Sequence, residues 1–268
     1  MNIGDGFYLR QYWGLMNKLL GLRMITNLHC NNNCNFCYQK DKSKTVLDLN
    51  ELLTQVKPYS YKHFEYCTIM GGESTLLSNL NEYVKIGSLY SKETRLTTNG
   101  KKLTCSLVRT LKSSGLKGIN VSIATCNPDE YKVIHGTTCN LDELFETMCN
   151  IEKYVDVRVN IPLCKENSEN DYISLKKTLE YLVYWCGYNV TICEDILGTY
   201  SLYDQFEKIG AKEVDHTDYG LIYLELYGKR IGYYTHRNNH YNKTDLVVTP
   251  LGTWENWDGY YEAVGMNV

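Results

Sequence analysis

Three cysteines stand close together near the start of the chain, in the stretch HCNNNCNFCYQK. Cys30, Cys34 and Cys37 follow one another at spacings of four and three positions. Three thiolates on one short loop can form disulfides, hold a zinc ion with His29 as a fourth ligand, or bind three irons of a [4Fe–4S] cluster. The chemistry open to this loop therefore ranges from a structural cross-link to electron transfer.

These three alternatives make different demands on the rest of the chain. The eleven cysteines are an odd number, and the first residues lack a basic stretch leading into an apolar one, so we expect a reducing cytoplasm where disulfides are rare. A tetrahedral zinc site needs a fourth ligand, but adjacent His29 and Cys30 should point in divergent directions. A [4Fe–4S] cluster with one iron open to another ligand is favoured, and a non-catalytic zinc-binding module remains the alternative from a different class.

The composition describes a folded protein. Hydrophobic residues make up 43% and charged residues 22% of the 268 positions, which is ordinary for a globular chain. No apolar run approaches the roughly 20 residues that cross a bilayer, so no membrane segment is expected. A net charge of −3 does not indicate nucleic acid as a partner, and a small-molecule substrate fits better.

Short apolar stretches alternate with longer amphipathic ones along most of the chain. Strands are predicted at residues 22–27, 65–70, 94–98, 118–124, 155–162 and 188–193. Helices are predicted within residues 47–56, 77–90, 102–115, 140–154 and 172–187, with a sixth near 202–209. The alternation predicts an α/β fold, a partial (β/α)6 TIM-like barrel with its working groups at the carboxyl ends of the strands.

The pattern changes after residue 210 to short strands with glycine turns. We expect an N-terminal segment (1–21), a barrel core (22–210) and a small β-rich C-terminal extension (211–268) that covers or flanks the barrel. Residues 227–243 mix cations with tyrosines, which fits either a solvated hairpin or a surface that stacks a base and holds phosphate. His236 and His240 in that stretch are four residues apart, but strand and turn surroundings argue against a metal site.

Two further groups of residues lie where predicted strands end. The stretch MGGES follows the second strand, and Gly71 and Gly72 would let a ligand approach the backbone, with exposed amides for a carboxylate or amino-acid group and Glu73 for a cation. Thr98, Asn99 and Ser122 offer hydroxyl and amide groups at the ends of the third and fourth strands. Turn formation and helix capping are the plainer roles for these residues.

Taken in order, these features resemble the radical S-adenosylmethionine (SAM) superfamily, whose hallmark is three cysteines at this spacing with an aromatic residue just before the last. Residues 22–195 are similar to the core of its molybdenum-cofactor GTP 3′,8-cyclase branch. The resemblance implies that a [4Fe–4S] cluster is bound by Cys30, Cys34 and Cys37. It implies that SAM is contacted by Phe36, Gly71, Gly72, Glu73 and Ser122. It implies substrate contacts by Arg23, Thr98, Asn99 and Arg158, and it leaves the catalytic residue unknown.

The resemblance implies reductive cleavage of SAM to a 5′-deoxyadenosyl radical, which abstracts hydrogen from a nucleotide or nucleoside-like substrate. An external one-electron donor such as flavodoxin or ferredoxin is implied as a partner. Modification of a peptide is the alternative reaction. We do not expect the cyclase activity itself, because no cysteine follows Cys193, the chain does not end in two glycines, and Thr68 occupies the position of a nucleotide-binding basic residue.

The eight other cysteines are scattered singly, and free cysteines usually act as small apolar side chains. Cys126 and Cys164 lie near predicted strand ends, so either could instead donate a hydrogen atom to a substrate radical. Ser74 stands where the superfamily usually has a proline, which affects the expected shape of that loop.

Overall fold

The computed structural model describes residues 19–39, 42–60, 63–196, 199–217, 221–235 and 244–265 of the 268-residue chain. In this part of the chain one eleven-stranded sheet has the order β11-β10-β1-β2-β3-β4-β5-β6-β9-β8-β7. Its strands are β1 (Gly21–Ile25), β2 (Phe64–Met70), β3 (Ser91–Thr98), β4 (Leu116–Ser122), β5 (Asp156–Pro162), β6 (Asn189–Cys193), β7 (Lys212–His216), β8 (Leu221–Leu226), β9 (Lys229–Tyr234), β10 (Asp245–Thr249) and β11 (Gly252–Trp254).

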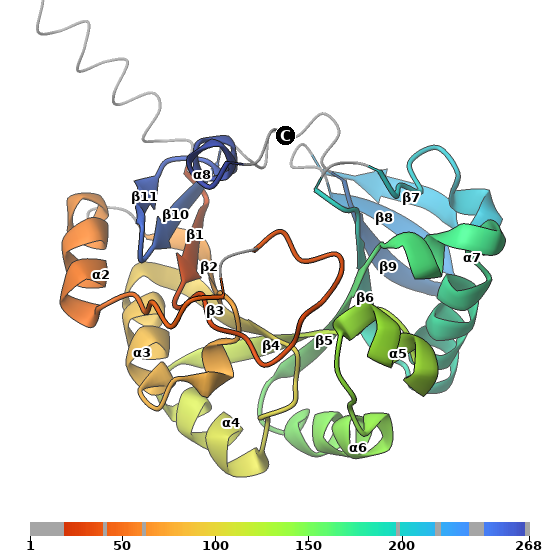
Figure 1. Ribbon diagram of the computed structural model, residues 1–268, viewed down its shortest axis with the longest axis horizontal. Coiled ribbons are helices and arrows are strands. Elements are labelled where there is room, and N and C mark those ends of the chain that lie inside the picture. Colours follow the sequence, from red (N-terminus) through yellow and green to blue (C-terminus); the bar gives the residue numbers. More distant parts are fainter. Residues whose placement is uncertain are drawn as a thin grey trace, which may run out of the picture.

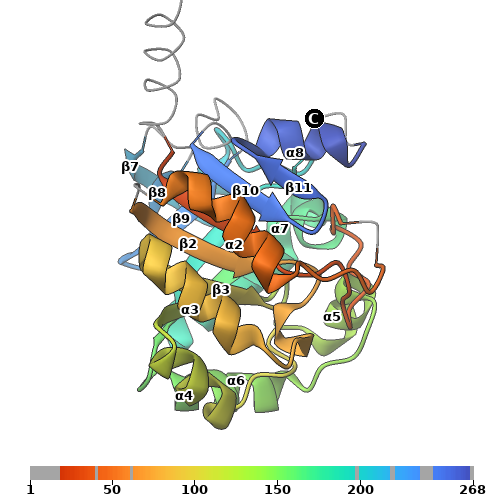
Figure 2. The same cartoon turned by 90° about the vertical axis from the view of Figure 1, so that its left-hand side faces the viewer.

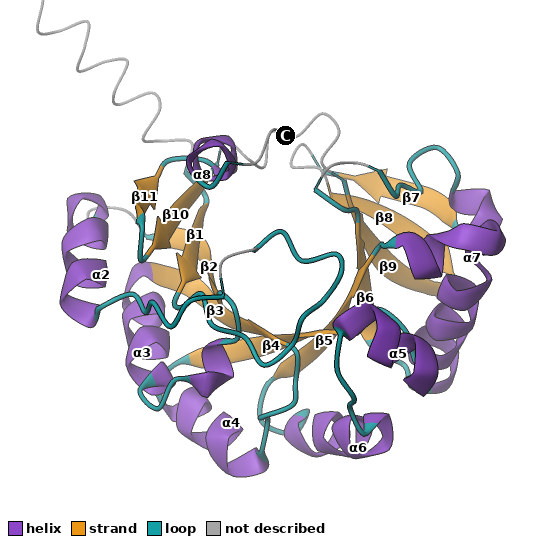
Figure 3. Cartoon of the chain, in the orientation of Figure 1, coloured by secondary structure: helices purple, strands orange, loops and turns teal. Residues whose placement is uncertain are grey.

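The sheet curves into an open arc, and most of the helices lie around its outside (Figures 1 and 3). The helices are α2 (Leu49–Val56), α3 (Leu80–Tyr90), α4 (Cys105–Ser113), α5 (Pro128–His135), α6 (Leu141–Ile151), α7 (Lys165–Leu179) and α8 (Trp257–Ala263). Short helical segments are η1 (Lys57–Tyr59), η2 (Ser74–Leu76), η3 (Glu180–Trp185) and η4 (Phe206–Ile209). Figure 2 shows α2 and α3 lying against the outer face of the sheet. This is the predicted α/β, TIM-like arrangement.

Alternation along the strands builds the core between the sheet and its outer helices. Leu22 and Met24 on β1 are fully buried in the main apolar cluster, whereas Arg23 between them faces the inside of the arc. The outer helices begin at side-chain caps: Asp48, for example, accepts hydrogen bonds from the amides of Asn50 and Glu51 at the start of α2. Each βα unit therefore follows from local sequence pattern.

All six predicted barrel strands are present, with ends that differ from the prediction by at most three residues. The structure differs from the expected elements at three places. Residues 202–209 form only the short segment η4, and α5 was not predicted. The stretch from 257 was predicted as strand because its aromatic residues favour strands, but it forms α8. Trp257, Tyr260 and Tyr261 are buried there against Ile25, so tertiary packing overrides the local preference.

The strands after residue 210 extend both edges of the barrel sheet. On one side β9 runs parallel to β6, and β8 and β7 follow it as antiparallel neighbours. On the other side β10 runs parallel to β1, with Asp245 opposite Gly21. The C-terminal residues thus flank the six core strands on both sides of one sheet. The described part of the chain contains no helix long and apolar enough to cross a membrane.

The turn after β2 lies directly against the loop that follows β1. The amide of Gly72 donates to the carbonyl of Asn27 at 2.7 Å, and the amide of Glu73 donates to the carbonyl of His29 at 2.8 Å. A Cβ atom at Gly72 would lie 2.1 Å from the carbonyl oxygen of His29. Only glycine permits this approach, which fixes where the β1 loop leaves the sheet.

We predict that Gly72→Ala lowers the free energy of unfolding by about 2–3 kcal/mol, because the clash is with backbone that cannot rotate away. Gly210→Ala is the control, since nothing lies within 4 Å of its Cβ position and only its positive φ is unfavourable. It should cost about 1 kcal/mol. Urea unfolding followed by circular dichroism measures both, and equal losses would contradict the proposed close contact.

Candidate functional site

The three clustered cysteines lie on the loop between β1 and α2, which crosses the inside of the arc (Figure 1). Cys30, Cys34 and Cys37 are half-buried, and their thiols are free. Burial and, to a smaller extent, the nearby thiols of Cys37 and Cys30 raise the pKa of Cys34 to about 12. Burial also raises the pKa of Cys30. The loop therefore holds three soft ligands close enough to influence one another.

A nitrogen donor approaches each of these sulfurs. The amide of Asn32 donates to Cys30 Sγ at 3.3 Å, and Lys42 Nζ donates to Cys37 Sγ at 3.2 Å. His135 Nδ1 lies 3.4 Å from Cys34 Sγ. Such contacts are typical of the surroundings of iron–sulfur clusters, where they set the reduction potential.

The described residues contain no group of three or more His, Cys, Asp or Glu side chains arranged around a single metal ion. The three thiols would suit a cluster, in which each thiolate binds its own iron. The donor set of this loop therefore fits the implied [4Fe–4S] group.

The carboxyl end of helix α5 lies against the cysteine loop. The amides of Asn33 and Asn35 donate to the carbonyls of His135 and Ile134 at 3.1 and 2.9 Å. The loop therefore provides hydrogen-bond donors for carbonyls at the carboxyl end of the helix, which have no partner within the helix. Phe36 packs edge-on against the His135 ring, with centroids 5.5 Å apart. Sequence reasoning missed both α5 and His135.

A signal for α5 was nevertheless present in the sequence. Asn127 followed by Pro128 is a helix start, and Gly136 is a helix stop. Asn127 accepts hydrogen bonds from the next two amides of α5, and Gly136 has φ +63. These residues stand at both ends of the eight-residue helix.

Glu73 is buried and accepts four hydrogen bonds. Its Oε1 accepts from Thr98 Oγ1 at 2.7 Å and from the amide and hydroxyl of Thr75 at 3.0 and 2.6 Å. Its Oε2 accepts from the amide of Asn99 at 2.8 Å. The side chain is thus occupied by neutral donors where a cation was expected. The expectation that the amides of this turn are exposed is wrong for Gly72 and Glu73, which pair with the β1 loop.

Thr98 and Asn99 are brought together with Glu73 and do not project into open space. Thr98 is 3% and Asn99 8% exposed. Asn99 Nδ2 donates to Asn31 Oδ1 at 2.7 Å, which ties the end of β3 to the cysteine loop. Ser122, at the end of β4, is half-buried and lies opposite Asn160 on β5.

The two predicted substrate arginines lie on different parts of the inner face. Arg23 Nε forms an ion pair with the buried carboxylate of Asp245 at 2.7 Å, and Arg23 Nη1 donates to Thr68 Oγ1 at 2.8 Å. Arg158 Nε pairs with Asp156 at 2.8 Å, and its side chain is 45% exposed. Arg158 is therefore more accessible than Arg23, whose side chain is 17% exposed.

Sequence reasoning missed Arg95, which lies between these two arginines on β3. It is opposite Thr68 on β2 and Gly118 on β4. Arg95 Nη1 pairs with Asp156 at 2.7 Å, and Arg95 Nε donates to Asn120 Oδ1 at 2.9 Å. The available signal was its position two residues after Glu93 in a largely polar strand, since alternate positions face one side of a sheet.

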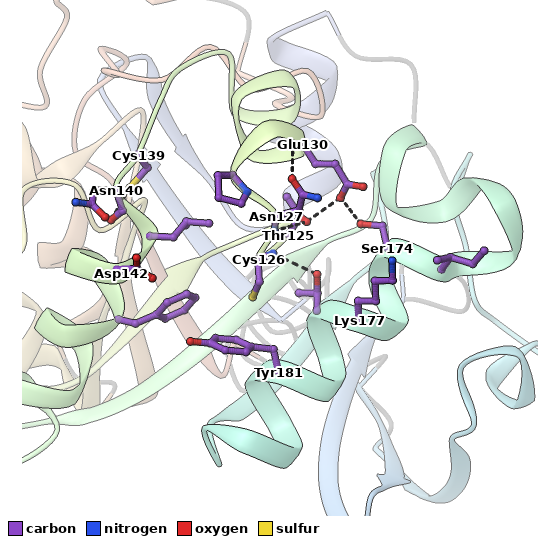
Figure 4. Close-up of a pocket in the computed structure, with 15 residues that line it drawn as sticks. Thr125, Cys126, Asn127, Glu130, Cys139, Asn140, Asp142, Ser174, Lys177 and Tyr181 are labelled. Atoms are coloured by element: carbon purple, nitrogen blue, oxygen red, sulfur yellow. Dashed lines mark hydrogen bonds between the residues drawn. The ribbon is translucent and has the colours of Figure 1, made fainter.

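A cavity of about 510 Å³ lies between α5, the start of α6 and α7 (Figure 4). Its lining includes Cys126, Lys177 and Tyr181, but none of the predicted cluster, cofactor or substrate residues. Glu130 in its wall accepts hydrogen bonds from Thr125 and Ser174. This cavity is separate from the candidate site.

Some of the remaining predicted residues are described by the structure and others are not. Cys164 is buried beside Phe36, Ala124 and Ile134, and burial raises its pKa to about 12. Residues 227–235 form the turn before β9 and that strand, whereas 236–243, with both predicted histidines, lie outside the described residues. So do residues 1–18 of the N-terminal segment.

We predict that Glu73→Gln lowers the free energy of unfolding by about 1–3 kcal/mol, because an amide nitrogen would face donors that now meet a carboxylate oxygen. Glu65→Gln is the control, since Glu65 forms an exposed ion pair with Lys92. It should change the free energy by less than about 0.5 kcal/mol. Denaturant titration compares the two, and a Glu73 variant as stable as the control would contradict this role.

The radical SAM superfamily model matches residues 24–179. GTP 3′,8-cyclase of Aquifex aeolicus is 29% identical over 210 residues, which cover 75% of this chain and 64% of that protein. The probable GTP 3′,8-cyclase of Methanococcus aeolicus is 33% identical over 134 residues, or 46% of this chain and 44% of that protein. The chain thus spans less than two thirds of the length of these relatives.

Solved structures share the fold. Streptococcus suis SuiB bound to its precursor peptide SuiA superposes with a TM-score of 0.65 at 14% identity, over 96% of this chain and 64% of that one. His-tagged anSMEcpe with bound AdoMet gives a TM-score of 0.53 at 16% identity, over 71% and 57% of the two chains. The family match covers the cysteine loop, the Gly-Gly-Glu turn and the strands that position them, and the chain belongs to the radical SAM superfamily.

Proposed function

We propose that this radical SAM enzyme binds its cluster through Cys30, Cys34 and Cys37 and abstracts hydrogen from a nucleotide or nucleoside-like small molecule. The cofactors of the enzyme are a [4Fe–4S] cluster and SAM, which together supply a 5′-deoxyadenosyl radical when bound and reduced. The observation that supports the site is the presence of three half-buried thiols on one loop, each with a nitrogen donor near its sulfur.

The protein's own contribution is to position these groups. Phe36, Gly71, Gly72, Glu73 and Ser122 are proposed to border SAM. The carboxylate of Glu73 accepts four hydrogen bonds that hold the turn after β2 against the end of β3. Its backbone amide pairs with the carbonyl of His29 on the cysteine loop. Burial of the loop within the arc limits the access of water to the reacting groups.

The substrate is proposed to lie along the inner face. Of the candidates Arg23, Thr98, Asn99 and Arg158, the last is the most exposed and lies two residues before Asn160 on the same face of β5. A guanidinium is well suited to phosphate, which supports a nucleotide. The similarity to proteins named GTP 3′,8-cyclase also supports this substrate class. We further propose an external one-electron donor such as flavodoxin or ferredoxin, and a cytoplasmic location.

We predict that anaerobic reconstitution with iron and sulfide gives a brown protein with about four irons per chain, which cleaves SAM on reduction. Cys34→Ser should lose most of this iron, because one of three ligands is removed. Cys149→Ser is the matched control, since Cys149 is exposed on α6. Iron content and 5′-deoxyadenosine are measured by colorimetry and chromatography. A colourless protein with one zinc would overturn the proposal in favour of a zinc module.

For the substrate, we predict deuterium transfer from a deuterated nucleotide into 5′-deoxyadenosine, read by mass spectrometry. Arg158→Gln should reduce this transfer about tenfold or more, the effect of losing one hydrogen bond to a charged group. The same variant should still cleave SAM without substrate at the wild-type rate. If deuterium is transferred from a peptide and not from any nucleotide tested, the alternative of a peptide-modifying enzyme would be established instead.

A further inference from the structure

His135, the last residue of α5, is a fully enclosed imidazole in contact with the cysteine loop. Its side chain is 1% exposed. The ring stacks on Tyr131 with centroids 4.0 Å apart and meets Phe36 edge-on. Its Nδ1 lies 3.4 Å from Cys34 Sγ. The imidazole is thus held between Tyr131 and Phe36, with Nδ1 facing the sulfur of Cys34.

The other ring nitrogen determines where the proton is. The amide of Ala124 donates to His135 Nε2 at 3.3 Å, so Nε2 acts as an acceptor and carries no hydrogen. A neutral imidazole then carries its single N–H on Nδ1, the atom that faces Cys34. A backbone group therefore selects the tautomer that can donate to the sulfur.

The direction of this donor is fixed by the chain on both sides. The amide of Asn33 donates to the carbonyl of His135, so the loop that carries Cys34 is bonded to the backbone of the same residue. Gly136 follows with φ +63, and a Cβ atom there would lie 2.5 Å from the carbonyl oxygen of Asn33. The histidine and the cysteine loop are consequently held together through their backbones.

We propose that His135 is a positioning residue that donates an Nδ1–H hydrogen bond to the Cys34 sulfur and thereby raises the reduction potential of the cluster. The inference rests on the proposed function, in which Cys34 is a cluster ligand. Reduction adds one electron, and the negative charge spreads over the sulfurs. A fixed N–H dipole beside one sulfur stabilises the reduced form more than the oxidised form. The external donor then has a smaller potential difference to overcome.

Three substitutions separate this role from simple packing. Asn places its amide near the position of Nδ1, Gln places its amide near the position of Nε2, and Phe keeps the ring but neither nitrogen. In an EPR-monitored redox titration of the reconstituted proteins, His135→Asn should keep the wild-type midpoint potential. His135→Gln and His135→Phe should both shift it to more negative values. At a fixed applied potential their ratio of reduced to oxidised cluster should fall about tenfold, the effect of one charge-assisted hydrogen bond.

Stability should follow a different order. His135→Gln can still accept from the Ala124 amide, whereas the Asn and Phe variants leave it without an acceptor and should unfold at lower urea concentration. A residue that acted only through packing would change potential and stability together. Potentials that follow the order of stability would overturn the inference.

The apo-protein gives a reading that does not depend on the cluster. Nitrogen-15 NMR of labelled imidazole should show His135 as the Nδ1–H tautomer at pH 7, and an Nε2–H tautomer would overturn the inference. A wild-type protein that binds no iron would overturn the proposed function together with this inference. A wild-type cluster whose potential is unchanged in His135→Phe would overturn this inference alone.

Discussion

The buried carboxylate of Glu73 joins the ends of the two strands against which the loop that carries the cysteines is held. It receives donors from the turn after β2 and from Thr98 and Asn99 at the end of β3, and Asn99 in turn donates to Asn31 on the loop. A charge removed from water must have all its hydrogen bonds supplied by the protein. The carboxylate is satisfied only when the turn after β2 and the end of β3 are in their native places. Because Asn99 and the Glu73 amide also bond to the cysteine loop, the position of that loop depends on the same two strand ends.

Local pattern predicted what lies within one βα unit. Six strands, five outer helices and the two motifs at their ends follow from apolar periodicity, capping residues and cysteine spacing. Contacts between distant parts of the chain could not be predicted in this way. The ion pair between Arg23 and Asp245 joins residues 222 positions apart, and the sequence around one residue does not indicate that the other is its partner. Helix α5 is short and presents few apolar positions, so its caps were the only strong signal, and His135 was missed with it.

The inner face of the sheet explains why the substrate residues were the hardest to identify from sequence. Polar side chains alternate with apolar ones on most core strands, and many of the polar side chains pair with one another. Arg95 and Arg158, for example, both form ion pairs with Asp156. Ion pairs of this kind satisfy charges inside the arc. A motif match cannot distinguish an arginine that stabilises the fold from one that binds a ligand. The exposed fraction of its side chain and its ion-pair partners in the structure can make this distinction.

The C-terminal helix gives the site an order of assembly. Tyr260 on α8 donates to Gln39 Oε1 at 3.0 Å, 221 positions earlier, and Tyr261 packs against Tyr38 with ring centroids 6.0 Å apart. During synthesis the three thiols therefore leave the ribosome long before the residues that cover their loop. Until residue 261 has emerged and docked, the cysteine loop lacks these contacts and its thiols are more accessible to solvent and to oxidants. A nascent chain stalled before α8 would therefore expose thiols that are half-buried in the folded protein.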